Sequence, residues 1–134
     1  MSARSKARKR ALDVVYAAEV RNRSALEQLA EVQADLQVND YTVELVHGVE
    51  EHRARLDEVI SDHLEGWTLG RMPAVDRNVL RLATFEILYV DDVPDAVAVS
   101  EALHLVRDLS TDESPAYVNG VLGGIVRDRE HLVG

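Results

Sequence analysis

The chain has 134 residues, enough for one domain with its own hydrophobic core, and it contains no cysteine, which excludes disulfide bonds and thiolate chemistry. The single Trp and single Phe favour a core of Leu, Val, Ile and Ala, and hence helices. The net charge is −9, yet the first ten residues carry five cations and no acid, so residues 11–134 carry −14. Because no apolar run approaches the ~20 residues of a membrane helix and the basic N-terminus lacks the apolar segment of a signal peptide, we expect a cytoplasmic protein.

Three helices are predicted in the first half of the chain. Apolar residues at helical spacing predict a helix over Ala3–Val20, with its cations away from the apolar stripe. A capping-box pattern opens a short second helix over 24–35. The longest helix is predicted from a cap at Asp40 to Gly66, because its apolar residues keep the 3.6-residue period for at least six turns. This helix is long enough to cross both halves of a domain.

Two more helices follow a connector in which Trp67 and Leu69 are expected to pack inward. The first opens at Pro73 and is apolar on more than one side, so we expect it to be the most buried helix. Pro94 disfavours a helical conformation at the residue before it and ends this element. A further helix is predicted over about 96–109.

The stretch from Ser110 to Val126 is predicted to be a polar loop that leads into the last helix. Ser114 is expected to cap this helix, with Pro115 at its first position. Three glycines within five positions need a structural reason, because each costs about 1 kcal/mol relative to Ala inside a helix. We expect Gly120 and Gly124, one turn apart, to let another helix backbone come close, and the helix to form the centre of the core. No segment predicts a strand, so the predicted fold class is all-α, a compact bundle of six to seven helices.

Catalytic and metal-binding motifs are not found. The five histidines form no i,i+4 pair and no H-E-x-x-H motif, so a metal site would require distant residues to converge. There is no nucleophile elbow and no phosphate loop, and the glycines near the C-terminus follow no strand. Adjacent acids are interpreted as solvated faces or caps. We therefore predict no enzyme, no metal and no cofactor.

The basic N-terminus is the remaining chemical feature. Its cations can neutralise phosphates, which would make binding dependent on salt. They are Arg4, Lys6, Arg8, Lys9 and Arg10. Tyr16 and Tyr117 are candidates for stacking on bases, although each also fits a half-buried core tyrosine whose hydroxyl reaches water. The acidic remainder of the chain favours a basic protein as a partner.

Several segments, in their order, carry a resemblance to a known family. They are the Ala-Arg-Lys-Arg-Ala start, Trp67-x-Leu-x-Arg-Met72, the run 75–88, the segment 93–102, and the stretch 112–122 with its Val-Asn-Gly-Val-Leu. Over nearly its whole length the chain resembles the bacterial transcription antitermination factors of the NusB family. It departs from the family pattern at Ser100, where an Asn is usual, and at Tyr117, where a Phe is usual.

The resemblance implies one RNA-binding domain over 1–134, with an N-terminal sub-bundle at about 1–65 and a C-terminal one at about 67–130. It implies binding to the boxA element of single-stranded leader RNA together with NusE, a ribosomal protein. With RNA polymerase and other Nus factors, such a complex reads through terminators in ribosomal RNA operons, without catalysis.

The resemblance also implies functional residues. The RNA-binding set is Arg4, Lys6, Arg8, Lys9, Arg10, Asp112, Glu113 and Tyr117. Tyr16 and Asp76 are expected at the contact with the partner protein. Arg81 and Glu86 are either a structural pair on a buried helix or contact residues.

Two other functions fit the same pattern. The helical RNA-binding domain of a ribosomal RNA methyltransferase resembles this family, but here the chain ends at Gly134 without a cofactor loop. The second possible function is that of a structural module that forms a homodimer through its Gly120 and Gly124 face.

Overall fold

The computed structural model describes residues 2–133, and within that range it consists of seven helices and contains no strand. The helices are α1 (Ala3–Val20), α2 (Ala25–Asp35), α3 (Asp40–Glu51), α4 (Arg53–Asp62), α5 (Ala74–Tyr89), α6 (Asp95–Leu109) and α7 (Ser114–Val133). The all-α prediction is confirmed, and the first helix begins and ends at its predicted residues. Between residues 2 and 133, no helix combines the length and hydrophobicity that a membrane span requires.

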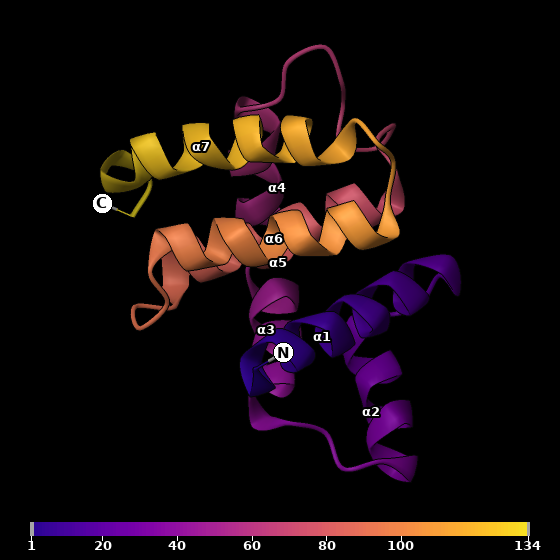
Figure 1. The fold of residues 1–134 in the computed structure, drawn as a ribbon. Helices are drawn as coiled ribbons and strands as arrows, with labels where there is room; N and C mark the ends of the chain where they lie inside the picture. The colour runs from indigo at the N-terminus through magenta and orange to yellow at the C-terminus, as the bar shows by residue number, and fades with distance from the viewer. Residues whose placement is uncertain (1, 134) are drawn as a thin grey trace.

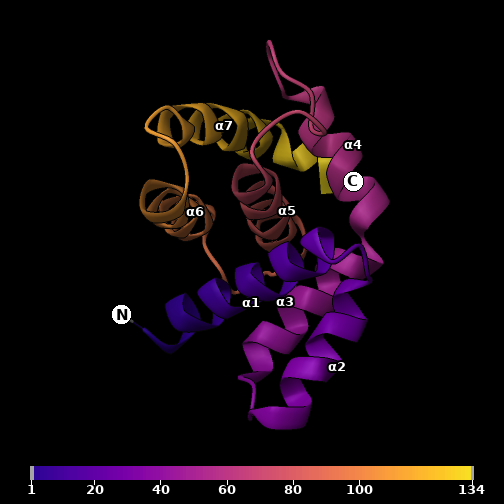
Figure 2. The same cartoon turned by 90° about the vertical axis from the view of Figure 1, so that its right-hand side faces the viewer.

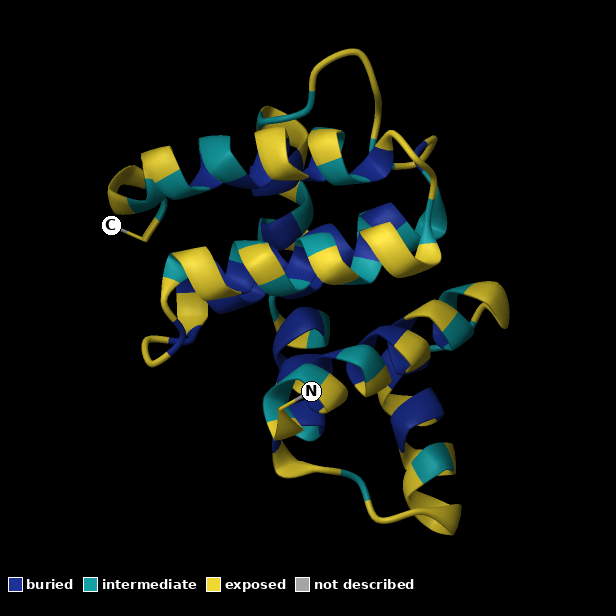
Figure 3. Cartoon of the chain, in the orientation of Figure 1, coloured by how far each residue is buried: buried dark blue, intermediate teal, exposed yellow. Residues whose placement is uncertain are grey.

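α5 is the centre of the molecule. It packs against α1, α3, α4, α6 and α7, and twelve of its sixteen residues are buried. Figures 1 and 2 show α5, α6 and α7 grouped on one side, with α1, α2 and α3 on the other. In Figure 3 the buried faces of the two groups turn toward each other, while the connectors before α3 and before α5 are mostly exposed. The expectation that the helix opening at Pro73 is the most buried is therefore confirmed, whereas α7, which buries only one face, is not the centre of the core.

The predicted long helix from Asp40 to Gly66 is wrong in two respects, because the structure divides it at His52 and ends it at Asp62. The His52 backbone leaves helical geometry (φ −102°, ψ 13°), and its ring stacks on Tyr89 with the centroids 4.0 Å apart. α3 packs on α1, α2 and α5, whereas α4 packs on α5 and α7. The apolar period continues through the break because both helices bury one face, so the pattern does not reveal that the two faces have different partners.

The expected close backbone approach at Gly120 and Gly124 is also wrong. A Cβ atom at Gly120 would meet no atom within 4 Å, so this glycine faces open space. A Cβ at Gly124 would lie 3.1 Å from Cδ2 of His63, which is the side chain of the residue after α4 and not a helix backbone. The glycine that does require close approach is Gly48 in α3, where a Cβ would overlap the Phe85 ring of α5.

Glu19 and Arg77 join the C-terminal end of α1 to the first turns of α5. The Arg77 guanidinium donates to both Glu19 carboxylate oxygens, at 2.9 and 2.7 Å, and this hydrogen bonding holds the pKa of Glu19 below its usual range. The Glu19 carboxylate therefore takes up a proton more readily in the unfolded chain than in the folded one. The stabilisation from its pair with Arg77 is complete above the unfolded-state pKa of about 4.3, and it is lost as the pH falls through the folded-state pKa.

We therefore expect Glu19→Gln to reduce the loss of unfolding free energy on acidification below about pH 4.3. Urea titrations between pH 7 and pH 3 measure this directly. Glu58→Gln, at an exposed carboxylate on α4, is the control. Equal pH dependence in the wild type and Glu19→Gln would contradict the assignment.

Candidate nucleic-acid interface

The N-terminal half of α1 presents its cations in different environments. Ser2 caps the helix, its hydroxyl accepting a hydrogen bond from the Ser5 amide at 3.0 Å. Lys6 and Arg10 are exposed, and within residues 2–133 neither forms an ion pair. Lys9 pairs with Asp13 at 2.7 Å on the same helix. Two cations of α1 therefore remain available to an external anion without breaking an internal pair.

Arg4 and Arg8 are tied to the rest of the protein. Arg4 pairs with Asp92 at 3.0 Å, and its guanidinium lies 4.2 Å from the centre of the Tyr41 ring. Arg8 is 5% exposed, and its Nε donates to both carboxylate oxygens of Glu86 at 2.9 and 3.1 Å. Its Nη1 lies 3.2 Å from Glu101. Arg8 thus fixes α1 to α5 and α6 and presents almost no surface to a ligand.

Glu86 lies beneath α1 and is almost entirely shielded from solvent. Burial raises its pKa, while the hydrogen bond from the Tyr41 hydroxyl and the Arg8 charge act in the opposite direction. Arg81, one turn earlier in α5, pairs with Asp57 of α4 at 2.7 Å. Arg81 and Glu86 therefore both form internal ion pairs, Arg81 with Asp57 and Glu19 and Glu86 with Arg8, and they do not pair with each other.

The loop between α6 and α7 carries Asp112 and Glu113, both exposed. It is held to α5 by Ser114, whose hydroxyl donates to Asp76 at 2.8 Å. The expected capping role of Ser114 is not observed, because its oxygen bonds Asp76 and accepts from the Thr111 amide instead. Asp76 has no exposed surface, so the structure gives its carboxylate no direct access to a partner.

Tyr117 joins α7 to the connector before α5. Its hydroxyl donates to the Glu65 carbonyl at 3.0 Å and accepts from the Glu65 amide at 3.2 Å. Its ring meets Trp67 edge-on, with the centroids 5.4 Å apart. Trp67 is 39% exposed, so the expected inward packing is only partial. Of this aromatic pair, the indole is the more exposed ring.

The two predicted groups of RNA-binding residues lie at opposite ends of α5. Arg4 meets Asp92 just beyond its C-terminus, whereas Ser114 meets Asp76 in its first turn. At 1.5 Å per residue, the ends of this helix are about 20 Å apart. α1 crosses α5 in the opposite direction, because Arg4 meets Asp92 beyond the C-terminus of α5 whereas Glu19 meets Arg77 in its first turns. Tyr16, near the C-terminal end of α1, is 40% exposed. A ligand that contacts both groups must therefore span about 20 Å.

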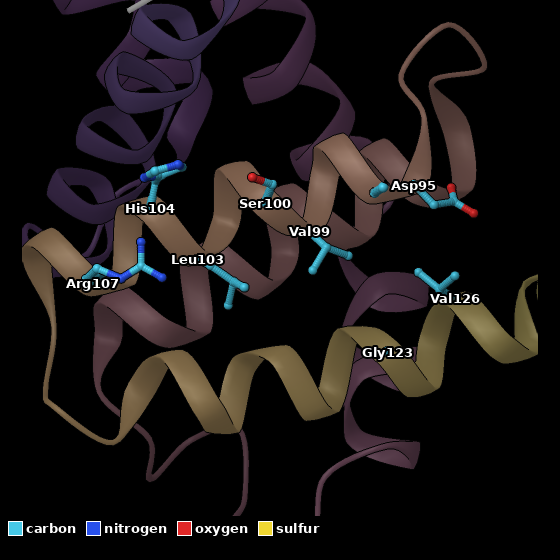
Figure 4. Close-up of a pocket in the computed structure, with 9 residues that line it drawn as sticks. Asp95, Val99, Ser100, Leu103, His104, Arg107, Gly123 and Val126 are labelled. Carbon is cyan, nitrogen blue, oxygen red and sulfur yellow. The ribbon is translucent and has the colours of Figure 1, made fainter.

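A separate groove lies between α6 and α7. It encloses about 440 Å³, and Figure 4 shows Val99 and Leu103 of α6 and Val126 of α7 directed into it. His104 and Arg107 lie at one end and Asp95 at the other. Its walls are apolar, which distinguishes it from the basic face of α1. Within residues 2–133, no three His, Asp or Glu side chains gather closely enough to hold a metal ion.

Comparisons with known proteins agree with one another. The NusB family model matches residues 5–127. A transcription antitermination protein NusB from a Nocardioides species is 63% identical over 98% of this chain and 99% of its own length. The solved NusB of T. maritima superposes with a TM-score of 0.87 at 30% identity, covering 96% of this chain and 93% of its own. A chain from a crystal structure of NusB and NusE in complex with double-stranded RNA superposes with a TM-score of 0.81 at 27% identity, covering 92% and 96%.

Proposed function

The chain belongs to the NusB family and is a transcription antitermination protein, and from this premise we propose how it engages its RNA and its partner. It binds boxA-type single-stranded leader RNA together with NusE, and with RNA polymerase and other Nus factors it promotes read-through of terminators in ribosomal RNA operons. It acts in the cytoplasm, as one domain and without a catalytic step. The complex of NusB, NusE and RNA among the superposed structures supports this assignment.

The observation that carries the proposal is the pair of free cations on α1. On a chain of net charge −9, Lys6 and Arg10 are exposed and unpaired within residues 2–133. The phosphate backbone of RNA supplies the anions that they lack, and Lys9 can join them by exchanging Asp13 for a phosphate. Arg4 and Arg8 serve the same interface indirectly, because their pairs with Asp92 and Glu86 hold this face of α1 in place.

The α6–α7 loop contributes a different kind of contact. Carboxylates repel phosphates but accept hydrogen bonds from the amino groups of bases. Asp112 and Glu113 therefore favour an RNA that turns its bases, and not its backbone, toward this end of the molecule. Tyr117 supports the site by holding the connector that carries Trp67.

The partner protein is assigned to the far end of α1. Tyr16 is 40% exposed there, and the acidic remainder of the chain suits a basic ribosomal protein. Asp76 acts through Ser114, by fixing the loop that neighbours this surface.

Salt dependence tests the RNA proposal. With three phosphates neutralised by Lys6, Lys9 and Arg10, the plot of log K against log salt should have a slope of about −2 for a single strand. Lys6→Ala/Arg10→Ala should flatten this slope by about 1.4, whereas Arg127→Ala, which removes an exposed cation of α7, should leave it unchanged.

The titration is made with boxA RNA and a scrambled oligomer, each with and without NusE. The proposal predicts tighter binding to boxA, and tighter still with NusE present. An unchanged slope in the double variant would contradict the assigned cations, and equal affinity for both oligomers would contradict the assigned RNA.

A further inference from the structure

A hollow of about 350 Å³ lies between α1 and the connector that joins α2 to α3. One wall is a single face of α1, with residues spaced at i, i+3, i+4 and i+7: Ala3, Lys6, Ala7 and Arg10. The other wall is formed by Gln37, Val38 and Asn39, with Thr42 beneath them. The two free cations of α1 therefore lie along one wall of an open surface hollow.

Several polar groups in this hollow are already bonded, which identifies those that are free. The Thr42 hydroxyl donates to the Ala7 carbonyl at 2.9 Å, and the side-chain oxygen of Asn39 accepts from the Tyr41 amide at 2.8 Å as the cap of α3. Among the described residues, no hydrogen bond engages the Gln37 amide group or the Asn39 amide nitrogen. Within residues 2–133, no acidic side chain lines the hollow; Asp40, which follows Asn39 in the chain, is exposed.

We propose that this hollow binds one nucleotide of a single-stranded RNA. Lys6 and Arg10 contact the phosphate oxygens. The base lies against the apolar atoms of Ala7 and Val38, and the free amide groups of Gln37 and Asn39 hydrogen-bond to its edge. The proposal rests on the proposed function and adds to it a place where a base is read.

The chemistry of the lining supports this ligand. Amide side chains pair with base edges through adjacent donor and acceptor groups, whereas cations without such neighbours hold phosphates alone. The volume lies at the lower end of the range of small-ligand sites, as expected for one nucleotide. A base within a duplex does not enter such a hollow, because its edge is already paired and the major groove of A-form RNA is too narrow for side chains.

The test separates base contacts from phosphate contacts. Gln37→Ala should weaken boxA binding about tenfold at every salt concentration and leave the salt slope unchanged, because it removes no charge. Asn39→Ser, which keeps an oxygen to cap α3 and adds no charge, should also weaken binding. Gln33→Ala, at an exposed amide of α2 outside the hollow, is the matched control and should bind like the wild type.

A second readout shows which nucleotide is bound. Abasic sites are placed one at a time along the boxA RNA, and each RNA is titrated against the wild type and Gln37→Ala. At one position the two losses should not add, because both remove the same contact. If every position is additive, or if Gln37→Ala and Asn39→Ser bind like the wild type, the nucleotide site is refuted while the cation-dependent salt slope, and with it the proposed function, stands. If the wild type does not bind boxA RNA, the proposed function itself fails.

Discussion

Glu86→Leu is expected to lower the free energy of unfolding by about 3–5 kcal/mol, because it leaves the guanidinium of Arg8 buried without its main partner. Both side chains are almost entirely buried, at 6% and 2% exposure, so water cannot replace the lost carboxylate. The Tyr41 hydroxyl also loses its acceptor. Urea unfolding at pH 7 measures the difference.

Arg8→Met/Glu86→Leu is the informative companion, because it removes both charges together. A buried ion pair replaced by apolar side chains of similar size often changes stability little, so this variant should recover most of the loss. Arg4→Met, which removes the exposed cation paired with Asp92, is the control and should change stability only slightly. A double variant as unstable as Glu86→Leu would show that the charges are not the cause.

The same double variant informs RNA binding. If Arg8 only holds α1 in place, the refolded double variant should keep the salt slope of the wild type, because Lys6, Lys9 and Arg10 are intact. A slope flatter by about 0.7 would instead assign Arg8 a phosphate of its own.

Gly48→Ala is expected to destabilise the protein by about 1–3 kcal/mol or more, although Ala is the better helix former. Its new methyl group would overlap the Phe85 ring, which is 6% exposed and stacks on His52 and Tyr89. To accommodate the methyl group, the ring or all of α3 must shift. Thermal and urea unfolding measure the loss.

Gly120→Ala is the matched control, because the same change is made inside a helix at a glycine that faces open space. It should stabilise the protein by up to about 1 kcal/mol. Gly48→Ala/Phe85→Leu should recover part of the stability lost in Gly48→Ala, since the smaller side chain makes room. A stabilising Gly48→Ala would contradict the close packing of α3 on α5.

The sequence by itself determined every helix except the division between α3 and α4, and it indicated which sides face solvent. The bounds of α1, the start of α5 after Pro73 and its deep burial all follow from local patterns, because helix period and proline geometry act within a few residues. The order of motifs along the chain indicated the family, which the comparisons confirm. The sequence shows that Lys6, Arg8 and Arg10 are all cations. Nothing in it indicates that Lys6 and Arg10 are unpaired whereas Arg8 is buried in an ion pair.

Only the tertiary structure decided which polar residues are bonded to one another. Arg8 meets Glu86 across 78 residues and Ser114 meets Asp76 across 38, and neither separation leaves a periodic signal. The break at His52 and the need for Gly48 depend in the same way on which helix lies opposite. Periodicity indicates that one face of a helix is buried, but not which atoms bury it, because this depends on how distant segments pack. The same packing decides whether a cation is free to bind a ligand or is held in an internal ion pair.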